Sequence, residues 1–293
     1  MPQDTSDLND LRRQIDEIDA SLHDAIVQRI ALIDRIAAAK GQTGGDTTAM
    51  RPNREAEVVR GLASRHHGPL QTAALVRVWR ELINAATAMQ GPLTVAVCAP
   101  ERSVGYWDLA RNHFGSGVPM TLHTSPSDVL RTIDEAPGAI GLLPMPQEGE
   151  AAPWWPALAS QPAGTAGAKV VWRLPFFASP TGRFENLEAL AVAKLAPEAS
   201  GQDRSLLVVE TDLDVSRARV VQVLGERGLT ARPLATHEAD GERRAQLLEV
   251  DGLIDIDGPA VAGFAEAMGE ALLRVSFLGA YPVALADERA EPS

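Results

Sequence analysis

The first forty residues repeat apolar side chains at the spacing of an α-helix. From about residue 6 to residue 40 apolar residues recur every three or four positions, and neither proline nor glycine interrupts the run. The apolar positions are Leu8, Leu11, Ile15, Ile18, Leu22, Ala25, Leu32, Ile33 and Ile36. At 1.5 Å per residue such a helix is roughly 50 Å long, which exceeds the width of a small domain. We therefore expect a second copy of the chain to cover part of the stripe in an interlocked dimer.

Two further helices are predicted in the same third of the chain. A Gly- and Thr-rich break covers residues 41–50, and the second helix begins near Pro52, a residue type favoured at the first helical position. Gly68 and Pro69 end it. The third helix covers residues 72–90, and its expected inner face consists of Leu75, Trp79, Leu82, Ile83, Ala86 and Gln90.

The period of the pattern changes after residue 92. Short apolar runs then alternate with helical stretches, which is typical of an α/β unit. Strands are predicted at 93–100, 119–124, 139–145 and 187–194, and helices at 106–114 and 125–136. Residues 146–186 are rich in Pro, Ala and Trp and fit no clear pattern.

The last third has the order βαββαβ, a small open-faced sandwich. Its predicted elements lie at 204–211, 216–228, 229–236, 244–252, 259–272 and 273–283. We therefore divide the chain into four parts: an all-α domain (1–91), an α/β domain (92–203), a βαββαβ domain (204–285) and a disordered tail (286–293).

Composition narrows the possible functions. The net charge of −12 argues against nucleic acid or an anionic membrane surface as the main partner. No apolar run approaches the ~18 residues of a membrane span, and the acidic N-terminus is unlike a leader, so we expect a cytoplasmic protein. The single cysteine, Cys98, excludes an internal disulfide and is expected in a strand core. Six scattered histidines have no ligand spacing, so no metal is expected.

Two cations stand on the apolar stripe of the first helix. Arg29 and Lys40 are eleven residues apart, three turns along one face. An unpaired cation among Leu and Ile is unfavourable, so an internal carboxylate or an anionic ligand should meet it. Arg54, Glu55 and Gln90 would complete a polar set inside an apolar bundle, the usual make-up of a small-molecule pocket.

Most of these charges also have a simpler explanation. Arg12 can pair with Asp16 one turn along an exposed face. Lys40 can be a solvated residue favoured by the helix dipole at a C-terminus. Arg54 and the glutamate after it can be surface charges, and the glutamine can merely end its helix. Arg29 is the hardest to explain in this way, because apolar residues flank it on both sides.

In this order the residues resemble the all-helical chorismate mutases. The similar stretches, within residues 8–90, are "LRRQIDEIDASLHDAIVQRIALIDRIAAAK", "RPNREAEVV" and "WRELINAATAMQ". The resemblance implies a three-helix protomer entwined as a homodimer. It also implies the conversion of chorismate to prephenate in aromatic amino acid biosynthesis, a rearrangement that needs no cofactor.

The resemblance implies roles for individual residues. Arg29 would bind one carboxylate of chorismate, and Arg12, reaching from the partner subunit, would bind the other. Lys40 and Gln90 would donate to the ether oxygen, on which negative charge grows as the C–O bond breaks. Glu55 would accept the ring hydroxyl.

Three more positions belong to the candidate substrate-binding set. Arg54 would support the carboxylate end. Ala86 stands where the family often has a hydroxyl-bearing residue, and Arg51 stands at a place that is acidic in some members. The last two are departures from the pattern, but neither removes a main charge.

The rest of the chain resembles the other parts of bifunctional chorismate mutase/prephenate dehydratases, which end in an ACT domain. "VAVCAPERSVGYWDLARNHFG" and "GAIGLLPMPQEGEA" are similar to dehydratase segments, and "LGAYPV" to the closing ACT strand. The middle region of ~110 residues is too short for the two-lobed dehydratase.

The chemical motifs of these parts are missing. The Thr-Arg-Phe triplet of the dehydratases falls on residues 187–189, which read Leu-Glu-Ala, and "TGRF" at 181–184 lies several residues too early. The Glu-Asn-Ser/Thr run expected after "LLP" reads Met-Pro-Gln at 145–147 instead. The amino-acid-binding motifs of the ACT domain fall on 215–217 and 235–238 and are also changed, and His237 is interpreted as a surface residue.

We therefore predict a chorismate mutase with non-catalytic C-terminal domains. Two alternatives stay open. One is a bifunctional enzyme that retains prephenate dehydratase activity, and the other is a C-terminal module that binds another enzyme of the shikimate pathway.

Overall fold

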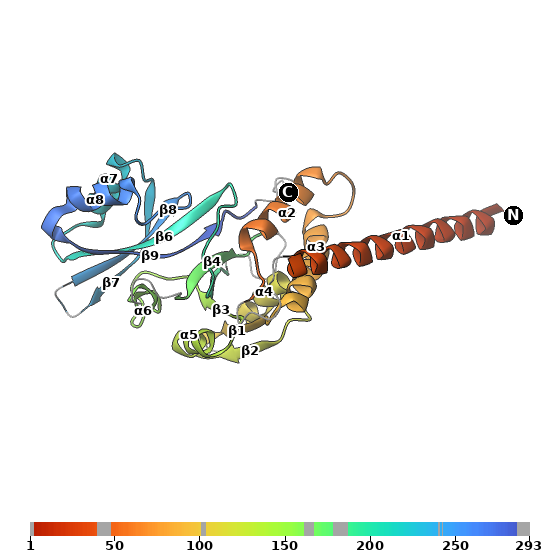
Figure 1. Ribbon diagram of the computed structural model, residues 1–293, viewed down its shortest axis with the longest axis horizontal. Helices are drawn as coiled ribbons and strands as arrows, with labels where there is room; N and C mark the ends of the chain where they lie inside the picture. Colours follow the sequence, from red (N-terminus) through yellow and green to blue (C-terminus); the bar gives the residue numbers. More distant parts are fainter. Residues whose placement is uncertain are drawn as a thin grey trace.

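The computed structural model describes residues 3–39, 48–100, 104–160, 167–177, 187–239, 241 and 243–285. It consists of a helical N-terminal segment followed by an α/β region built on one large mixed sheet (Figure 1). The expectations for Lys40, for residues 181–184 and for the tail 286–293 lie outside the described residues.

Three helices form the N-terminal segment, as the sequence predicts. They are α1 (Gln3–Ala39), α2 (Pro52–Arg65) and α3 (Thr72–Gln90). Pro52 occupies the start of α2, where its missing N–H costs no helical hydrogen bond. Helix α1 projects away from the rest of the chain, and only its C-terminal part lies beside α3 (Figure 1).

The apolar stripe of α1 is exposed in the single chain. With 37 residues the helix is roughly 55 Å long, so most of it extends beyond any part of its own chain that could cover it. The exposed apolar side chains are Leu8, Leu11, Ile15, Ile18, Leu22, Ile26, Val27, Leu32 and Ile36. Large contiguous apolar surface of this kind is typical of an interface with another chain.

The buried face of α3 coincides with the predicted one only in part, at Ile83 and Ala86. Leu75, Trp79 and Leu82 are only half-buried, whereas a neighbouring face is fully buried against the α/β region. The buried residues of α3 are Thr72, Ala73, Val76, Arg80, Ile83, Asn84, Ala86 and Thr87. The apolar periodicity missed this face because it is rich in polar side chains.

The sheet of the α/β region has nine strands in the order β2-β1-β3-β5-β4-β9-β6-β8-β7. The first five in sequence are β1 (Thr94–Cys98), β2 (Met120–His123), β3 (Ala139–Pro144), β4 (Lys169–Leu174) and β5 (Ala189–Ala193). Strand β1 pairs in parallel with β2 and β3, whereas β5 is antiparallel to both β3 and β4. Cys98 is fully buried in β1, as expected, and burial raises the pKa of its thiol to about 11.

Three helices accompany these strands: α4 (Val104–Phe114), α5 (Pro126–Glu135) and α6 (Trp155–Ala159). Residues of α2 and α3 share one hydrophobic core with β1, β3, β4 and β5, so the helical segment packs directly on the sheet. The opposite face of the sheet packs against α5 and α6. Strand β4 and helix α6 fall within residues 146–186, the stretch in which no element was predicted.

The predicted βαββαβ order is confirmed. It consists of β6 (Asp203–Asp212), α7 (Arg217–Glu226), β7 (Ala231–Ala239), β8 (Arg243–Asp251), α8 (Pro259–Met268) and β9 (Leu272–Pro282), with a 3-10 turn, η2 (Gly269–Ala271), before β9. Helices α7 and α8 lie together on one face of these strands and form a core with them (Figure 1). Among the described helices, none is long and apolar enough to cross a membrane.

The two predicted C-terminal domains share one continuous sheet, because β4 pairs in parallel with β9 at Val170 and Gly279. Gly279 has a φ of +142°, and a Cβ there would lie 2.2 Å from the carbonyl oxygen of Val170. Only glycine permits the two backbones to approach this closely. The expected boundary near residue 203 therefore divides segments that remain hydrogen-bonded to one another.

Candidate functional site

Arg29 lies in the C-terminal third of α1 and is half-buried. Its Nη1 is buried and has no hydrogen-bond partner in the described part of the chain. Burial lowers the pKa of its guanidinium because the charged form loses solvation. A buried, unpaired guanidinium nitrogen is suited to bind a carboxylate that comes from outside the chain.

Arg12 is exposed on the distal half of α1. The described residues contain no ion pair between Arg12 and Asp16, and the pair formed there is Arg13–Asp10, at 3.1 Å. Seventeen residues of helix separate Arg12 from Arg29, which is roughly 25 Å along the axis. One small molecule therefore cannot bind both arginines of the same chain.

Glu55 is buried in the first turn of α2, where its backbone N–H donates to the carbonyl of Arg51 at 2.9 Å. Its Oε2 accepts from Nη1 of Arg80 at 2.9 Å, and both side chains are almost completely buried. Its other oxygen, Oε1, has no partner among the described residues. Burial raises the pKa of Glu55, and the Arg80 charge opposes this shift.

The two arginines around Glu55 point elsewhere. Arg54 is exposed and pairs with Glu57 one turn along α2, at 2.8 Å. Arg51 is half-exposed, and its Nη1 lies 4.0 Å from a carboxylate oxygen of Glu198. The simple surface explanation therefore describes Arg54 in the single chain, whereas it does not describe the buried Glu55.

Ala86 and Gln90 lie in the last turns of α3. Ala86 is buried, and its carbonyl accepts a hydrogen bond of 3.0 Å from Nε2 of Gln90. Gln90 is the last residue of the helix and is half-buried. One of the two N–H donors of its amide is thus used within the helix.

The single chain does not gather the predicted residues into one enclosed site. Arg12 is far from Arg29, Glu55 is bound to Arg80, and Lys40 lies outside the described residues. Two cavities lined by described residues lie elsewhere. One, of 280 Å³, lies beside the end of α5, and the other, of 120 Å³, lies between α6 and the βαββαβ strands.

His237 lines the smaller cavity and is not the plain surface residue that we expected. Its side chain is half-buried, and its ring stands edge-on to Trp155 with 6.4 Å between ring centroids. The sequence could not show this contact, because α6 lies in the unassigned stretch.

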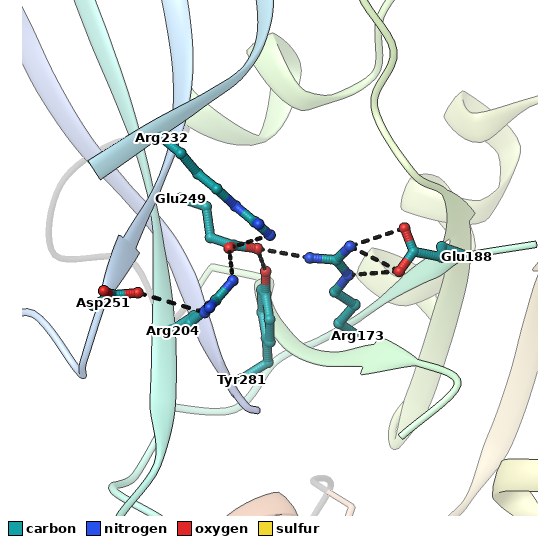
Figure 2. Close-up of polar contacts among 7 residues, drawn as sticks. All are labelled: Arg173, Glu188, Arg204, Arg232, Glu249, Asp251 and Tyr281. Carbon is teal, nitrogen blue, oxygen red and sulfur yellow. Dashed lines mark hydrogen bonds and ion pairs between the residues drawn. The ribbon is translucent and has the colours of Figure 1, made fainter. Parts of the chain in front are cut away.

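A second charged cluster lies where the two parts of the sheet meet (Figure 2). Its centre is Glu249 on β8, which is 1% exposed. Four side chains donate to this carboxylate: Arg173 at 2.8 Å, Arg204 at 2.5 Å, Arg232 at 2.5 Å and the Tyr281 hydroxyl. Burial, and next the charge of Glu249, raises the pKa of Tyr281, so this phenol stays protonated and donates.

Arg173 on β4 connects this cluster to the start of β5. Its Nη2 donates to both oxygens of Glu188, at 2.7 and 2.8 Å, while its Nη1 reaches Glu249 (Figure 2). Glu188 is the middle residue of the three positions where the dehydratase resemblance places Thr-Arg-Phe. An acidic side chain, already paired with an arginine, thus stands where the resemblance implies a cation.

Known proteins are similar to this chain in the helical segment and beyond it. Residues 11–91 match the family Chorismate mutase type II. The resemblance stated for the helical segment is thereby confirmed, and the chain carries a chorismate mutase type II domain.

Two similar curated proteins are bifunctional chorismate mutase/prephenate dehydratases. The protein of Pseudomonas aeruginosa is 31% identical over 152 residues, which cover 51% of this chain and 41% of that protein. The protein of Stutzerimonas stutzeri is 28% identical over 148 residues, which cover 50% and 40% respectively. The chain thus matches about two fifths of the length of these relatives, and alignments of this size include residues beyond the helical segment.

Similar solved structures share low sequence identity with this chain. A prephenate dehydratase from Streptococcus mutans has a TM-score of 0.44 and 12% identity, covering 66% of this chain and 99% of its own. A protein described as GqqA, a novel type of quorum quenching acylase, has a TM-score of 0.45 and 10% identity, covering 65% and 95% respectively. At these TM-scores neither likeness supports a conclusion about this chain.

The Glu249 cluster leads to a prediction about stability. Glu249→Ala should lower the free energy of unfolding by about 3 kcal/mol or more, because it leaves several partly buried arginine charges without their anion. Glu238→Ala is the matched control: it removes a more exposed partner of Arg244 in the same part of the sheet and should cost less than about 1 kcal/mol. Urea denaturation of both variants measures the difference, and equal losses would contradict the structural role of Glu249.

Proposed function

We propose that this protein is a chorismate mutase that converts chorismate to prephenate. The observation that carries the proposal is the buried, unpaired Nη1 of Arg29, within a segment that matches the chorismate mutase type II family. Chorismate carries two carboxylates, and a guanidinium that lacks an internal anion is suited to bind one of them. A cytoplasmic location is part of the proposal and rests on composition.

The proposed mechanism is orientation combined with fixed electrostatic stabilisation. Arg29 and a partner's Arg12 hold the two carboxylates, so that the side chain stays folded over the ring and the reacting carbons stay close. Lys40 and Gln90 donate to the ether oxygen as the C–O bond breaks and negative charge grows there. Glu55 offers its unpaired Oε1 to the ring hydroxyl. No proton has to move to or from the protein.

Two observations support a homodimer with shared sites. The apolar stripe of α1 is exposed along most of a 37-residue helix, and burial at roughly 25 cal/mol per Å² would strongly favour covering it. In addition, Arg12 and Arg29 are too far apart in one chain to bind the same molecule. A site that uses both arginines therefore takes them from two chains.

The C-terminal region is proposed to be non-catalytic, with a truncated dehydratase-like part and an ACT-like part. The ion pair of Glu188 with Arg173 supports this assignment. Glu188 stands at the position where the triplet would have its arginine, and its charge is neutralised by Arg173. The curated relatives are bifunctional, which favours retained dehydratase activity as the second candidate. A role in binding another shikimate-pathway enzyme is the third.

The first test concerns Arg29. Arg29→Ala should lower kcat/KM for chorismate by more than about a hundredfold, because the loss of a bidentate charge contact affects both binding and orientation. Arg35→Ala, an exposed arginine on the same helix outside the candidate set, should retain turnover. The assay follows chorismate consumption, with circular dichroism to verify folding. Full activity of the Arg29 variant would refute the proposal.

The second test concerns sharing of the site between chains. Arg12→Ala and Arg29→Ala should each be inactive alone. When the two are unfolded together and refolded as a mixture, half of the dimers should be mixed, and each mixed dimer has one of two sites intact. Turnover should then recover to about a quarter of the wild-type value. No recovery, with mixed dimers present in native mass spectrometry, would show that each site belongs to a single chain.

The third test separates the first two functional candidates. The purified chain supplied with prephenate should form no phenylpyruvate above the rate without protein, because no cation occupies the expected triplet. Phenylpyruvate formation at a rate comparable to chorismate turnover would instead establish the bifunctional candidate. An established prephenate dehydratase under the same conditions serves as the positive control.

A further inference from the structure

A buried ion pair between α2 and α3 contacts the α/β region through its arginine. Arg80 on α3 lies between Glu55 and two aromatic rings that come from β4 and the residues directly after it. The Cζ of Arg80 lies 4.8 Å from the ring centroid of Trp172 and 5.4 Å from that of Phe176. Both rings are buried. The guanidinium thus has a carboxylate on one side and aromatic faces on the other, an arrangement that fixes its position.

The ion pair is asymmetric. Nη1 of Arg80 binds Oε2 of Glu55, whereas Oε1 of Glu55 and Nη2 of Arg80 are both buried without a partner in the described chain. A pair that served packing alone would gain from satisfying both oxygens, since an unpaired buried acceptor costs about 1–3 kcal/mol. Buried ion pairs are also weak contributors to stability compared with apolar residues of the same size. The arrangement instead fixes the carboxylate and leaves one oxygen free to accept.

We propose that Arg80 is a positioning residue for Glu55 and that Trp172 and Phe176 of the α/β region hold Arg80 in place. The proposal rests on the proposed function, in which Oε1 of Glu55 accepts the ring hydroxyl of chorismate. Arg80 does not touch the substrate. Its charge favours the ionised form of Glu55 and its hydrogen bond orients the carboxylate, so the appended region contributes to the mutase site through two aromatic side chains.

The charges around Glu55 influence the pH at which its carboxyl group ionises. Arg80 from α3 faces it directly. His113 from α4 faces the same aromatic cluster, with its ring edge-on to Trp172 at 4.7 Å between centroids. Burial, and next the Arg80 charge, places the pKa of His113 well below its usual value, so this histidine is neutral near pH 7. Removing Arg80 takes away the largest effect that opposes burial and leaves only the backbone hydrogen bond at Arg51, so the pKa of Glu55 rises further.

The experiment compares chorismate turnover across pH in the full chain. Arg80→Met should lower kcat/KM by about tenfold at pH 7. The kcat/KM of this variant should rise again as the pH is raised, because Glu55 ionises at higher pH. Arg80→Lys keeps the charge and should lie between Met and wild type. The control is Glu81→Gln, a neighbouring interface residue whose carboxylate accepts from the Ser116 N–H at 2.9 Å, and it should leave the pH profile unchanged.

A double variant protects the test against simple loss of folding. Arg80→Met leaves a buried carboxylate uncompensated, whereas Arg80→Met with Glu55→Gln removes both charges and should fold. If Arg80 acts through Glu55, the double variant is no less active than Glu55→Gln alone. Fully additive losses would overturn the positioning role, and so would an Arg80→Met profile parallel to that of the wild type.

An NMR titration separates this proposal from the proposed function. In protein labelled with [13C]glutamate, the carboxyl signal of Glu55, assigned by its absence in Glu55→Gln, should titrate at higher pH in Arg80→Met than in wild type. A wild-type chain without chorismate turnover would refute the proposed function and the role in catalysis. An unchanged Glu55 titration in an active enzyme would refute only the positioning role of Arg80.

Discussion

The charge of a buried arginine is costly unless an anion lies against it, and two ion-pair clusters of this protein follow from that cost. Arg80 meets Glu55 beneath the helical segment, and Arg173 meets Glu188 and Glu249 where the sheet continues into the βαββαβ strands. Arg29 has one buried nitrogen for which the described chain provides no anion. The proposed function assigns an external carboxylate to this nitrogen.

The helical segment and the α/β region are packed as one body. Residues of α2 and α3 share a hydrophobic core with the sheet, and Arg60 on α2 donates to the carbonyls of Ser200, Gln202 and Val283 at 2.9–3.0 Å. These contacts come from segments far apart in the sequence. The appended region thus supports the mutase helices whether or not it retains a reaction of its own.

Helix α1 differs from the rest of the chain in how little of its apolar surface is covered. The central strands of the sheet are buried on both faces, whereas α1 presents an uncovered apolar stripe along roughly 55 Å. The pairing of β4 with β9 at Gly279 covers the edges of both strands, so no free sheet edge remains between the two C-terminal parts.

Elements whose apolar residues recur at a regular spacing were predictable from the sequence alone. The bounds of α3, the start of α2 at Pro52 and the βαββαβ order follow from local patterns, since helical and strand spacing is written into consecutive residues. The prominence of Arg29 followed from its apolar flanks in the same way. Strand β4 and helix α6 were not predicted, because their Pro-, Ala- and Trp-rich stretch has no period.

Which charged side chains form ion pairs is visible only in the folded chain. Glu55 and Arg80 are 25 residues apart, and Arg173 and Glu249 are 76 apart, so no local pattern could join them. It also revealed the second, polar face of α3 and the burial of His237 against Trp155. Periodicity reports which side of an element is buried when that side is apolar. A buried polar side is stabilised by partners that long-range folding supplies, and sequence spacing does not encode them.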